Sequence, residues 1–145
     1  MSVVLNSEQE TEAYGAELWS TLPEKTLVFL RGSLGAGKTT LVRGFLRAAG
    51  YKGVVKSPTY TLVEEYYIKG RKIFHFDLYR LKDPEELEWI GIQDYFSENA
   101  VCFIEWPEMG TGMLPEADME IEITPKNQIR VLQVLKNIFN KYEKQ

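Results

Sequence analysis

An α/β fold with three layers and a mixed, mainly parallel sheet is what the sequence predicts, and two neighbouring segments carry that prediction. A short apolar run of strand type at residues 26–30 leads into a glycine-rich loop at residues 32–39. After the loop, apolar side chains recur at helical spacing at Leu41, Val42, Phe45, Leu46 and Ala49. Gly50 then suits the end of that helix. A strand, a glycine loop and a helix in this order are typical of an α/β fold built on a parallel sheet.

The glycine-rich loop fits the phosphate-binding pattern G-x-x-x-x-G-K-[ST], because residues 32–39 read Gly-Ser-Leu-Gly-Ala-Gly-Lys-Thr. A loop that wraps phosphate must aim several backbone N–H groups inward, and glycine permits the backbone angles this needs. Lys38 can reach the β- and γ-phosphates, and the Thr39 hydroxyl can ligate Mg²⁺. A chance match is the alternative, but the flanking strand and helix favour a P-loop NTPase-like protein that binds ATP and Mg²⁺. The residues expected to contact the nucleotide are Ser33, Leu34, Gly35, Ala36, Gly37, Lys38, Thr39 and Thr40.

Size and composition limit the classes of protein to which this chain can belong. With 145 residues, one domain spanning residues 1–145 is expected. The net charge of −4 argues against tight, autonomous binding of nucleic acid, which needs a basic face. Cys102 lies in an apolar run and is interpreted as a small buried residue. No apolar run is long enough to span a membrane and the first residues do not resemble a signal peptide, so a soluble cytoplasmic protein is expected.

The chain before the loop predicts a strand and a helix. Residues 2–6 have strand character, and the segment from Ser7 to Glu10 is a capping box that opens a helix to about Ser20. Ser7 and Thr11 can also approach the nucleotide base, although roles as helix cap and helix surface are favoured.

Three strand-like runs follow the first unit, and two of them end in an acid. Residues 62–67 and 72–77 are joined near Gly70 and predict a hairpin, which adds antiparallel strands to the parallel core. Asp77 ends the second run, and Glu105 ends a later apolar run at residues 101–105. One acid can serve the metal and the other the attacking water, or either can be a turn residue at a strand end. His75 is interpreted as a strand residue rather than a metal ligand, because no second metal-type residue is close in sequence.

The other segments are less specific. The polar loop at residues 56–61 is either an ordinary connection or a sensor of the γ-phosphate. Asp83 and Pro84 predict a helix start, with the helix ending at Gly91. A loop at residues 106–115 and a half-exposed strand at residues 119–124 follow. The tail is ambiguous, because residues 129–131 start like a strand while residues 134–142 fit a helix.

Four segments together resemble the bacterial TsaE family. They are residues 35–40 (Gly-Ala-Gly-Lys-Thr-Thr), 56–61 (Lys-Ser-Pro-Thr-Tyr-Thr), 75–81 (His-Phe-Asp-Leu-Tyr-Arg-Leu) and 104–106 (Ile-Glu-Trp). The first segment is shared by many ATPases, whereas the other three in this order are specific, and the resemblance covers about residues 26–123. It implies a small Mg²⁺-dependent ATPase that supports threonylcarbamoyl modification of adenosine 37 in tRNAs reading codons that begin with A. The implied partners are a TsaD-type threonylcarbamoyl transferase and a TsaB-type scaffold, with tRNA reached only through their complex.

The same resemblance assigns roles to positions of this chain. It implies that Lys38 binds phosphate, that Thr39 and Glu105 hold Mg²⁺, and that Asp77 is the second essential acid. Residues 59–61 become a switch-like loop. Ser33 departs from the family, which usually has an acid there, and the tail after residue 124 carries no family motif.

The residues suggest three other functions and one docking surface. A small-molecule kinase shares the loop but usually adds a lid with arginines, and few residues follow Glu105 to build one. A regulatory GTPase would need Asn-Lys-x-Asp, whose nearest match at residues 140–143 lacks the final Asp. The third is an adaptor that binds nucleotide without turnover. For docking, Arg43 and Arg47 predict a basic helix face that is either solvated or contacts the partner, and Arg80 is a second candidate.

Overall fold

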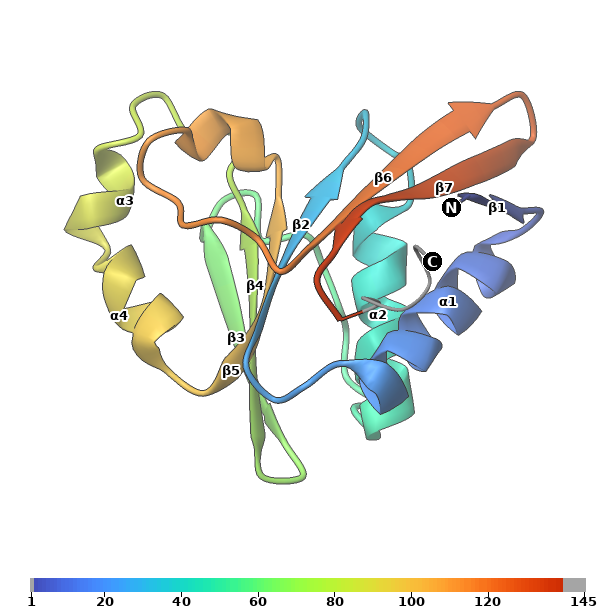
Figure 1. Cartoon of the computed structure of the whole chain (residues 1–145), viewed down its shortest axis with the longest axis horizontal. Helices are drawn as coiled ribbons and strands as arrows, with labels where there is room; N and C mark the ends of the chain where they lie inside the picture. The colour runs from blue at the N-terminus through green and yellow to red at the C-terminus, as the bar shows by residue number, and fades with distance from the viewer. Residues whose placement is uncertain (1, 140–145) are drawn as a thin grey trace.

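The computed structural model describes residues 2–139, which form one mixed sheet with helices on both faces (Figure 1). Its strands are β1 (Ser2–Leu5), β2 (Thr26–Arg31), β3 (Val63–Ile68), β4 (Arg71–Asp77), β5 (Ala100–Glu105), β6 (Met119–Lys126) and β7 (Ile129–Asn137). Its helices are α1 (Glu8–Thr21), α2 (Lys38–Ala49), α3 (Glu86–Trp89) and α4 (Ile92–Ser97), with a 3₁₀ helix η1 (Pro107–Gly110).

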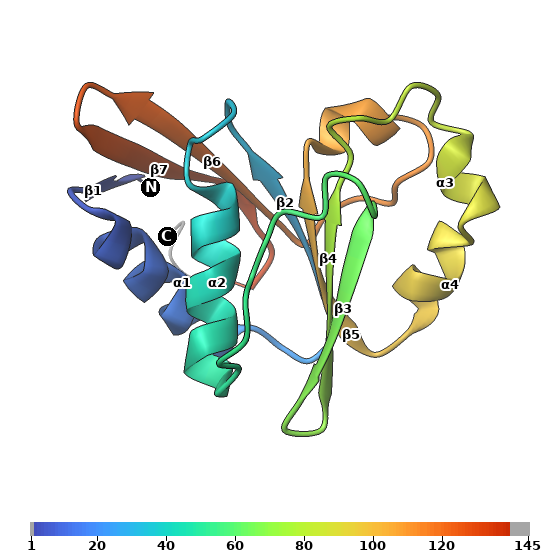
Figure 2. The ribbon, with the colours of Figure 1, turned by 180° about the vertical axis from the view of Figure 1, so that it is seen from behind.

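The strand order is β1-β7-β6-β2-β5-β4-β3. The central strands β6, β2, β5 and β4 run parallel, while β1, β7 and β3 pair antiparallel at the two sides. Helices α1 and α2 lie on one face of the sheet and α3 and α4 on the other, as Figure 1 and the reverse view in Figure 2 both show. The predicted three-layer α/β fold is therefore confirmed.

Each face of the sheet carries its own apolar core. Alternate residues of a strand point to opposite faces, so β5 contributes Phe103 to the α1–α2 side and Ile104 to the α3–α4 side. On the first side Phe45 of α2 is fully buried against Phe103, with ring centroids 4.9 Å apart. Since His75 and Asp77 are spaced by two residues on β4, both belong to this same α2-facing side.

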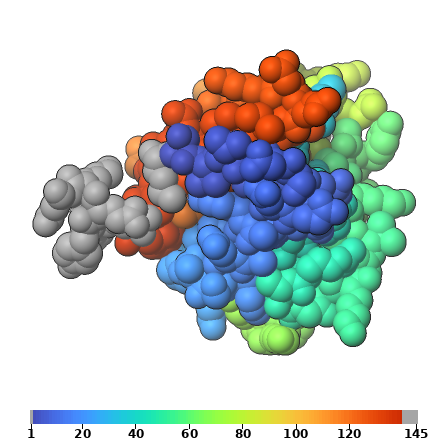
Figure 3. All heavy atoms as spheres, turned by 90° about the vertical axis from the view of Figure 1, so that its right-hand side faces the viewer, coloured from blue at the N-terminus to red at the C-terminus, as the bar shows by residue number. Residues whose placement is uncertain are grey.

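Two glycines allow α1 and α2 to approach closely. A Cβ atom built on Gly15 would lie 2.0 Å from the Leu41 carbonyl oxygen, and one built on Gly44 would lie 2.0 Å from the Glu12 carbonyl oxygen. No larger residue fits there without moving a helix. The contact brings the start of α1 beside the glycine loop, and Figure 3 shows the N-terminal residues lying between β7 and α2.

The predicted hairpin is confirmed by the antiparallel register of β3 and β4. Its turn residues Lys69 and Gly70 both have positive φ, 52° and 75°, as a tight two-residue hairpin turn requires. The segment between α2 and β3 returns to the end of the sheet that carries the glycine loop (Figure 2).

The short helix expected after Asp83 and Pro84 is α3, which ends before Gly91 as predicted, because Gly91 takes φ 71°. A separate helix, α4, begins after Gly91 and was not predicted. One helix prediction needs correction. The helix expected at residues 134–142 is wrong through Asn137, because β7 extends that far. Both neighbours of β7, β1 and β6, offer backbone hydrogen bonds, and this pairing outweighs helix propensity. The rest of that prediction lies at or beyond the end of the described residues. Within residues 2–139 no helix is long and apolar enough to cross a membrane.

Candidate functional site

The glycine loop connects the end of β2 to the start of α2, as the sequence predicts. Gly32 and Gly37 have φ values of 148° and 112°, in the region that glycine tolerates best. A Cβ atom on Gly32 would also lie 2.5 Å from the Ile123 carbonyl oxygen on β6. The close approach of β6 and the backbone angle therefore require glycine at position 32. The loop leaves the N–H groups of the first turn of α2 facing a ligand bound against it.

A cavity of about 240 Å³ lies on one side of this loop. Its wall contains the segment from Leu34 to Thr40, together with Ser57, Thr59, Asp77, Glu105 and Trp106. All the predicted site residues are brought together here except Ser33. The Ser33 carbonyl oxygen instead accepts a hydrogen bond from the Ala36 N–H inside the loop, at 3.1 Å. Asp77 and Glu105 are register partners on the neighbouring strands β4 and β5, which explains why two acids far apart in sequence line one cavity.

Lys38 is a buried cation aimed into this cavity. The residue is only 4% exposed to solvent. Its Nζ donates a hydrogen bond to the Gly32 carbonyl oxygen and lies 4.0 Å from the centroid of the Trp106 ring. Burial lowers the pKa of Lys38 from its ordinary value, opposed by the charges of Glu105, Asp77 and Glu108. A buried ammonium with no carboxylate in ion-pair contact among the described residues is well suited to receive an anion such as phosphate.

Thr39 and Glu105 form the part of the site that suits a hard cation. The Thr39 hydroxyl donates to Glu105 Oε2 at 2.7 Å, so a hydroxyl and a carboxylate lie side by side. Mg²⁺ prefers oxygen ligands and is commonly bound through one or two protein groups plus substrate phosphates. The residues present therefore fit Mg²⁺ carried by a nucleotide, as predicted for these two positions.

His75 also reaches this carboxylate, which the sequence reasoning missed. Its Nε2 lies 2.7 Å from Glu105 Oε2, and its residue is fully buried. The interpretation of His75 as an ordinary strand residue is therefore incomplete. A signal was available, because a residue two positions before Asp77 on a strand faces the same side as Asp77.

Asp77 joins the polar loop at residues 56–61 to the strand end. Its Oδ2 accepts hydrogen bonds from the Ser57 hydroxyl and from the Thr59 hydroxyl, the latter at 3.1 Å, and its Oδ1 accepts the Tyr79 N–H at 2.9 Å. These bonds hold two of the loop's hydroxyls at the edge of the cavity. Of the two interpretations of this loop, that arrangement favours the γ-phosphate sensor over an ordinary connection.

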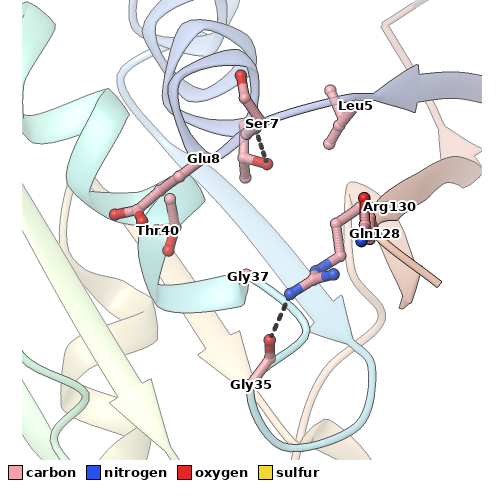
Figure 4. Close-up of a pocket in the computed structure, with 9 residues that line it drawn as sticks. Leu5, Ser7, Glu8, Gly35, Gly37, Thr40, Gln128 and Arg130 are labelled. Carbon is pink, nitrogen blue, oxygen red and sulfur yellow. Dashed lines mark hydrogen bonds between the residues drawn. The ribbon is translucent and has the colours of Figure 1, made fainter. Parts of the chain in front are cut away.

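A second cavity, of about 230 Å³, lies on the other side of the glycine loop (Figure 4). Arg130 reaches from β7 to the loop, where its Nε donates to the Ala36 carbonyl oxygen at 3.0 Å and an Nη donates to the Gly35 carbonyl oxygen at 3.4 Å. The cavity is lined by Leu5, Ser7, Glu8, Thr11, Gly35, Gly37, Thr40, Gln128 and Arg130. Gln128 and Arg130 were missed by the sequence analysis, since nothing local to the tail links it to a loop 94 residues earlier.

Ser7 is the predicted helix cap, whereas Thr11 is buried and not on the helix surface as expected. The Ser7 hydroxyl accepts the Glu10 N–H at 3.1 Å, which is the helix cap, and Thr11 is buried. Both residues also line the second cavity.

Arg43, expected on a basic helix face that is either solvated or contacts a partner, is paired within the chain. Its guanidinium forms ion pairs with Glu8 and Glu12 of α1, and the hydrogen bond to Glu12 is the main cause that raises the pKa of Arg43. Arg47 is also engaged within the chain, donating to the carbonyl oxygens of Tyr51 and Gly53. These arginines hold α1 and the segment after α2 in place.

Arg80 lies beside the polar loop. An Nη of Arg80 donates to the Tyr60 hydroxyl at 3.0 Å, and its guanidinium carbon lies 4.4 Å from the Tyr60 ring centroid. It does not line either of the two cavities beside the glycine loop, and Tyr60 itself is strongly exposed.

The sequence of this chain is similar to those of proteins from one family. Residues 5–132 match the family described as Threonylcarbamoyl adenosine biosynthesis protein TsaE. The tRNA threonylcarbamoyladenosine biosynthesis protein TsaE of Haemophilus influenzae is 58% identical over 109 residues, covering 75% of this chain and 69% of that protein. Its namesake in Aquifex aeolicus is 37% identical over 131 residues, covering 89% and 92% of the two chains.

The fold is shared with a solved structure. The crystal structure of Bacillus subtilis YdiB superposes with a TM-score of 0.80 at 26% sequence identity, covering 99% of this chain and 89% of that one. The match to the family spans the strand–loop–helix unit, both acid-bearing strands and Arg130. The chain belongs to the TsaE family.

Proposed function

We propose that this protein binds and hydrolyses ATP with Mg²⁺, and that this reaction serves the threonylcarbamoyl modification of adenosine 37 in tRNAs reading codons that begin with A. The observation that carries the proposal is the pair of cavities that share the glycine loop. One is lined by a buried lysine, two acids and four hydroxyl side chains, and the other is lined by helix-start residues and an arginine. A nucleotide laid across the loop would place its phosphates in the first cavity and its nucleoside in the second.

Each functional residue of the first cavity would have a separate role in phosphoryl transfer. Lys38 would hold the β- and γ-phosphates, and the loop N–H groups with the start of α2 would surround the same charge. Thr39 and Glu105 would hold Mg²⁺, which when bound neutralises phosphate charge. Asp77 would orient the attacking water, and the hydroxyls of Ser57 and Thr59 that it holds would lie beside the γ-phosphate.

The proposed partners are a TsaD-type threonylcarbamoyl transferase and a TsaB-type scaffold. The names of the Haemophilus and Aquifex relatives link those proteins to tRNA threonylcarbamoyladenosine biosynthesis. A net charge of −4 makes direct binding of tRNA unfavourable, so tRNA would be reached through the partner complex. We therefore expect slow hydrolysis by this chain alone and faster hydrolysis with the partners.

The decisive experiment measures phosphate release and multi-turnover tRNA modification, each with and without the TsaB–TsaD complex. We expect both to require Lys38 and Mg²⁺, with hydrolysis stimulated by the complex. A wild-type protein that binds no nucleotide would overturn the proposal, and one that hydrolyses ATP without stimulation would overturn the partnership. Radiolabel transferred from ATP to a small-molecule acceptor would favour the kinase alternative instead.

A further inference from the structure

His75 is a fully buried imidazole with one hydrogen-bond partner. Its Nε2 contacts Glu105 Oε2 at 2.7 Å, the same oxygen that accepts the Thr39 hydroxyl at 2.7 Å. Its Nδ1 has no partner among residues 2–139. Because an ionised carboxylate only accepts hydrogen bonds, Nε2 carries the proton and donates it to Glu105.

Packing alone gives no reason for a histidine at this position. The strand residues on either side are Phe74 and Phe76, and the α2-facing side of β4 and β5 is apolar at Ile73 and Phe103. A buried ring nitrogen without a partner is unfavourable, so an apolar ring would fill this space at least as well. What an apolar ring would lose is the contact with Glu105.

If the bond to His75 is lost, the Glu105 carboxylate has a competing partner in the Lys38 ammonium. It lies close enough to Lys38 for its charge to act on that ammonium, yet the two form no ion pair among the described residues. An ion pair between them would occupy both the phosphate-binding cation and the metal-binding carboxylate. The bonds from His75 and Thr39 keep the carboxylate turned toward the start of α2 instead.

We propose that His75 is a positioning residue, which donates its Nε2–H to Glu105 and fixes that carboxylate beside Thr39 for Mg²⁺. This inference rests on the proposed function and deepens it, because it assigns the group that orients the metal-binding acid. Hydrogen-bonding partners of metal ligands commonly change metal affinity about tenfold or more when they are removed.

Three substitutions of His75 test whether an N–H donor at the position of Nε2 is needed. His75→Gln keeps an N–H group at the distance of Nε2 along the side chain. His75→Asn keeps an amide but places it at the level of Nδ1, too short to reach Glu105. His75→Phe fills the space with no donor.

The test is a calorimetric titration of ADP into each variant, once with Mg²⁺ and once with EDTA, alongside urea denaturation. In His75→Phe and His75→Asn we expect the gain in affinity from Mg²⁺ to fall about tenfold. Affinity in EDTA should change less than twofold, and His75→Gln should keep most of the gain. His75→Phe should be at least as stable as the wild type.

Two outcomes overturn the positioning role alone: a full Mg²⁺ gain in His75→Phe, or an equal loss of affinity in EDTA. A wild type that binds no ADP, or gains nothing from Mg²⁺, overturns the proposed function as well. The unsubstituted protein offers a second measurement, because its only histidine gives a single set of imidazole NMR signals. Adding Mg²⁺ to the ADP-saturated protein should shift the His75 Nε2–H resonance, and an unmoved resonance would also refute the role.

Discussion

Replacing Lys38 by methionine should have opposite effects on nucleotide binding and on the stability of the free protein. Methionine keeps most of the buried stem of Lys38 and removes its charge. In the free protein that charge is buried, with the Gly32 carbonyl oxygen and the Trp106 ring as its neighbours and no ion-paired carboxylate among the described residues. Its removal should therefore stabilise the fold while it weakens the hold on phosphate.

The loss of affinity can be estimated from the contacts. Charge-assisted hydrogen bonds from Lys38 to the β- and γ-phosphates contribute about 1.5–3 kcal/mol each. Giving up the Trp106 contact costs about 1 kcal/mol, which is a typical cation–π energy. The lower end of the balance is about 2 kcal/mol, so ATP affinity should fall about thirtyfold or more.

The effect on stability has a direction set by the pKa of Lys38. Burial lowers this pKa below the ordinary 10.5 that applies in the unfolded chain. Between the two values the unfolded chain binds more protons, so the free energy of unfolding of the wild type should rise with pH in that alkaline window. Below the lowered pKa the full cost of the buried charge is present. Lys38→Met should be more stable there and should lose this part of the pH dependence.

The assay combines calorimetry for ATP with urea denaturation across the alkaline range. Lys72→Met is the matched control, because Lys72 is an exposed lysine whose ion pair with Glu98 is remote from the glycine loop. The control should leave ATP affinity unchanged and should not stabilise the fold. Unchanged ATP affinity in a folded Lys38→Met protein would refute the phosphate-binding role, and lower stability would refute the reasoning about the buried charge.

Three further predictions follow from the site. Glu105→Ala should shift the Mg²⁺ concentration needed for hydrolysis whereas Asp77→Ala should lower the rate with little shift, and equal Mg²⁺ responses would contradict this division. Trp106→Phe should remove most of the change in tryptophan emission caused by Mg²⁺-nucleotide, since Trp106 covers Lys38; a persisting signal would assign it to the other tryptophans. Arg130→Ala should weaken the binding of ATP more than the binding of inorganic triphosphate, because Arg130 lines the second cavity. Equal losses of affinity in competition binding would contradict the placement of the nucleoside in that cavity.

Local signals made the first cavity predictable. The loop, its lysine and its threonine are contiguous, and a strand that ends in an acid is visible as an apolar run followed by Asp77 or Glu105. Parallel strands end at the same edge of a sheet, and the register of β4 and β5 sets Asp77 directly opposite Glu105. Both acids therefore line the cavity beside the loop.

Pairing between distant segments accounts for what the sequence did not predict. Residues 129–131 start like a strand, as expected, but pairing of β7 with β1 and β6 continues that strand to Asn137, although residues from 134 onward fit a helix. The same pairing places Arg130 beside the loop. The alternation of β4 puts His75 on the same face as Asp77, but its partner Glu105 is 30 residues away in sequence. Neither contact is encoded in a local pattern, because each depends on which strands become neighbours.

The register of β4 and β5 also explains why two acids in one cavity are not interchangeable. Asp77 and Glu105 sit opposite each other, yet their carboxylates turn to different partners. Glu105 is held by Thr39 of α2, where the first turn of the helix meets the phosphates in the proposed function. Asp77 is held by Ser57 and by its own strand's continuation at Tyr79, so it belongs with the polar loop rather than with the helix. An exchange of the two acids would therefore keep the charge of the cavity but place neither carboxylate within its present bonds.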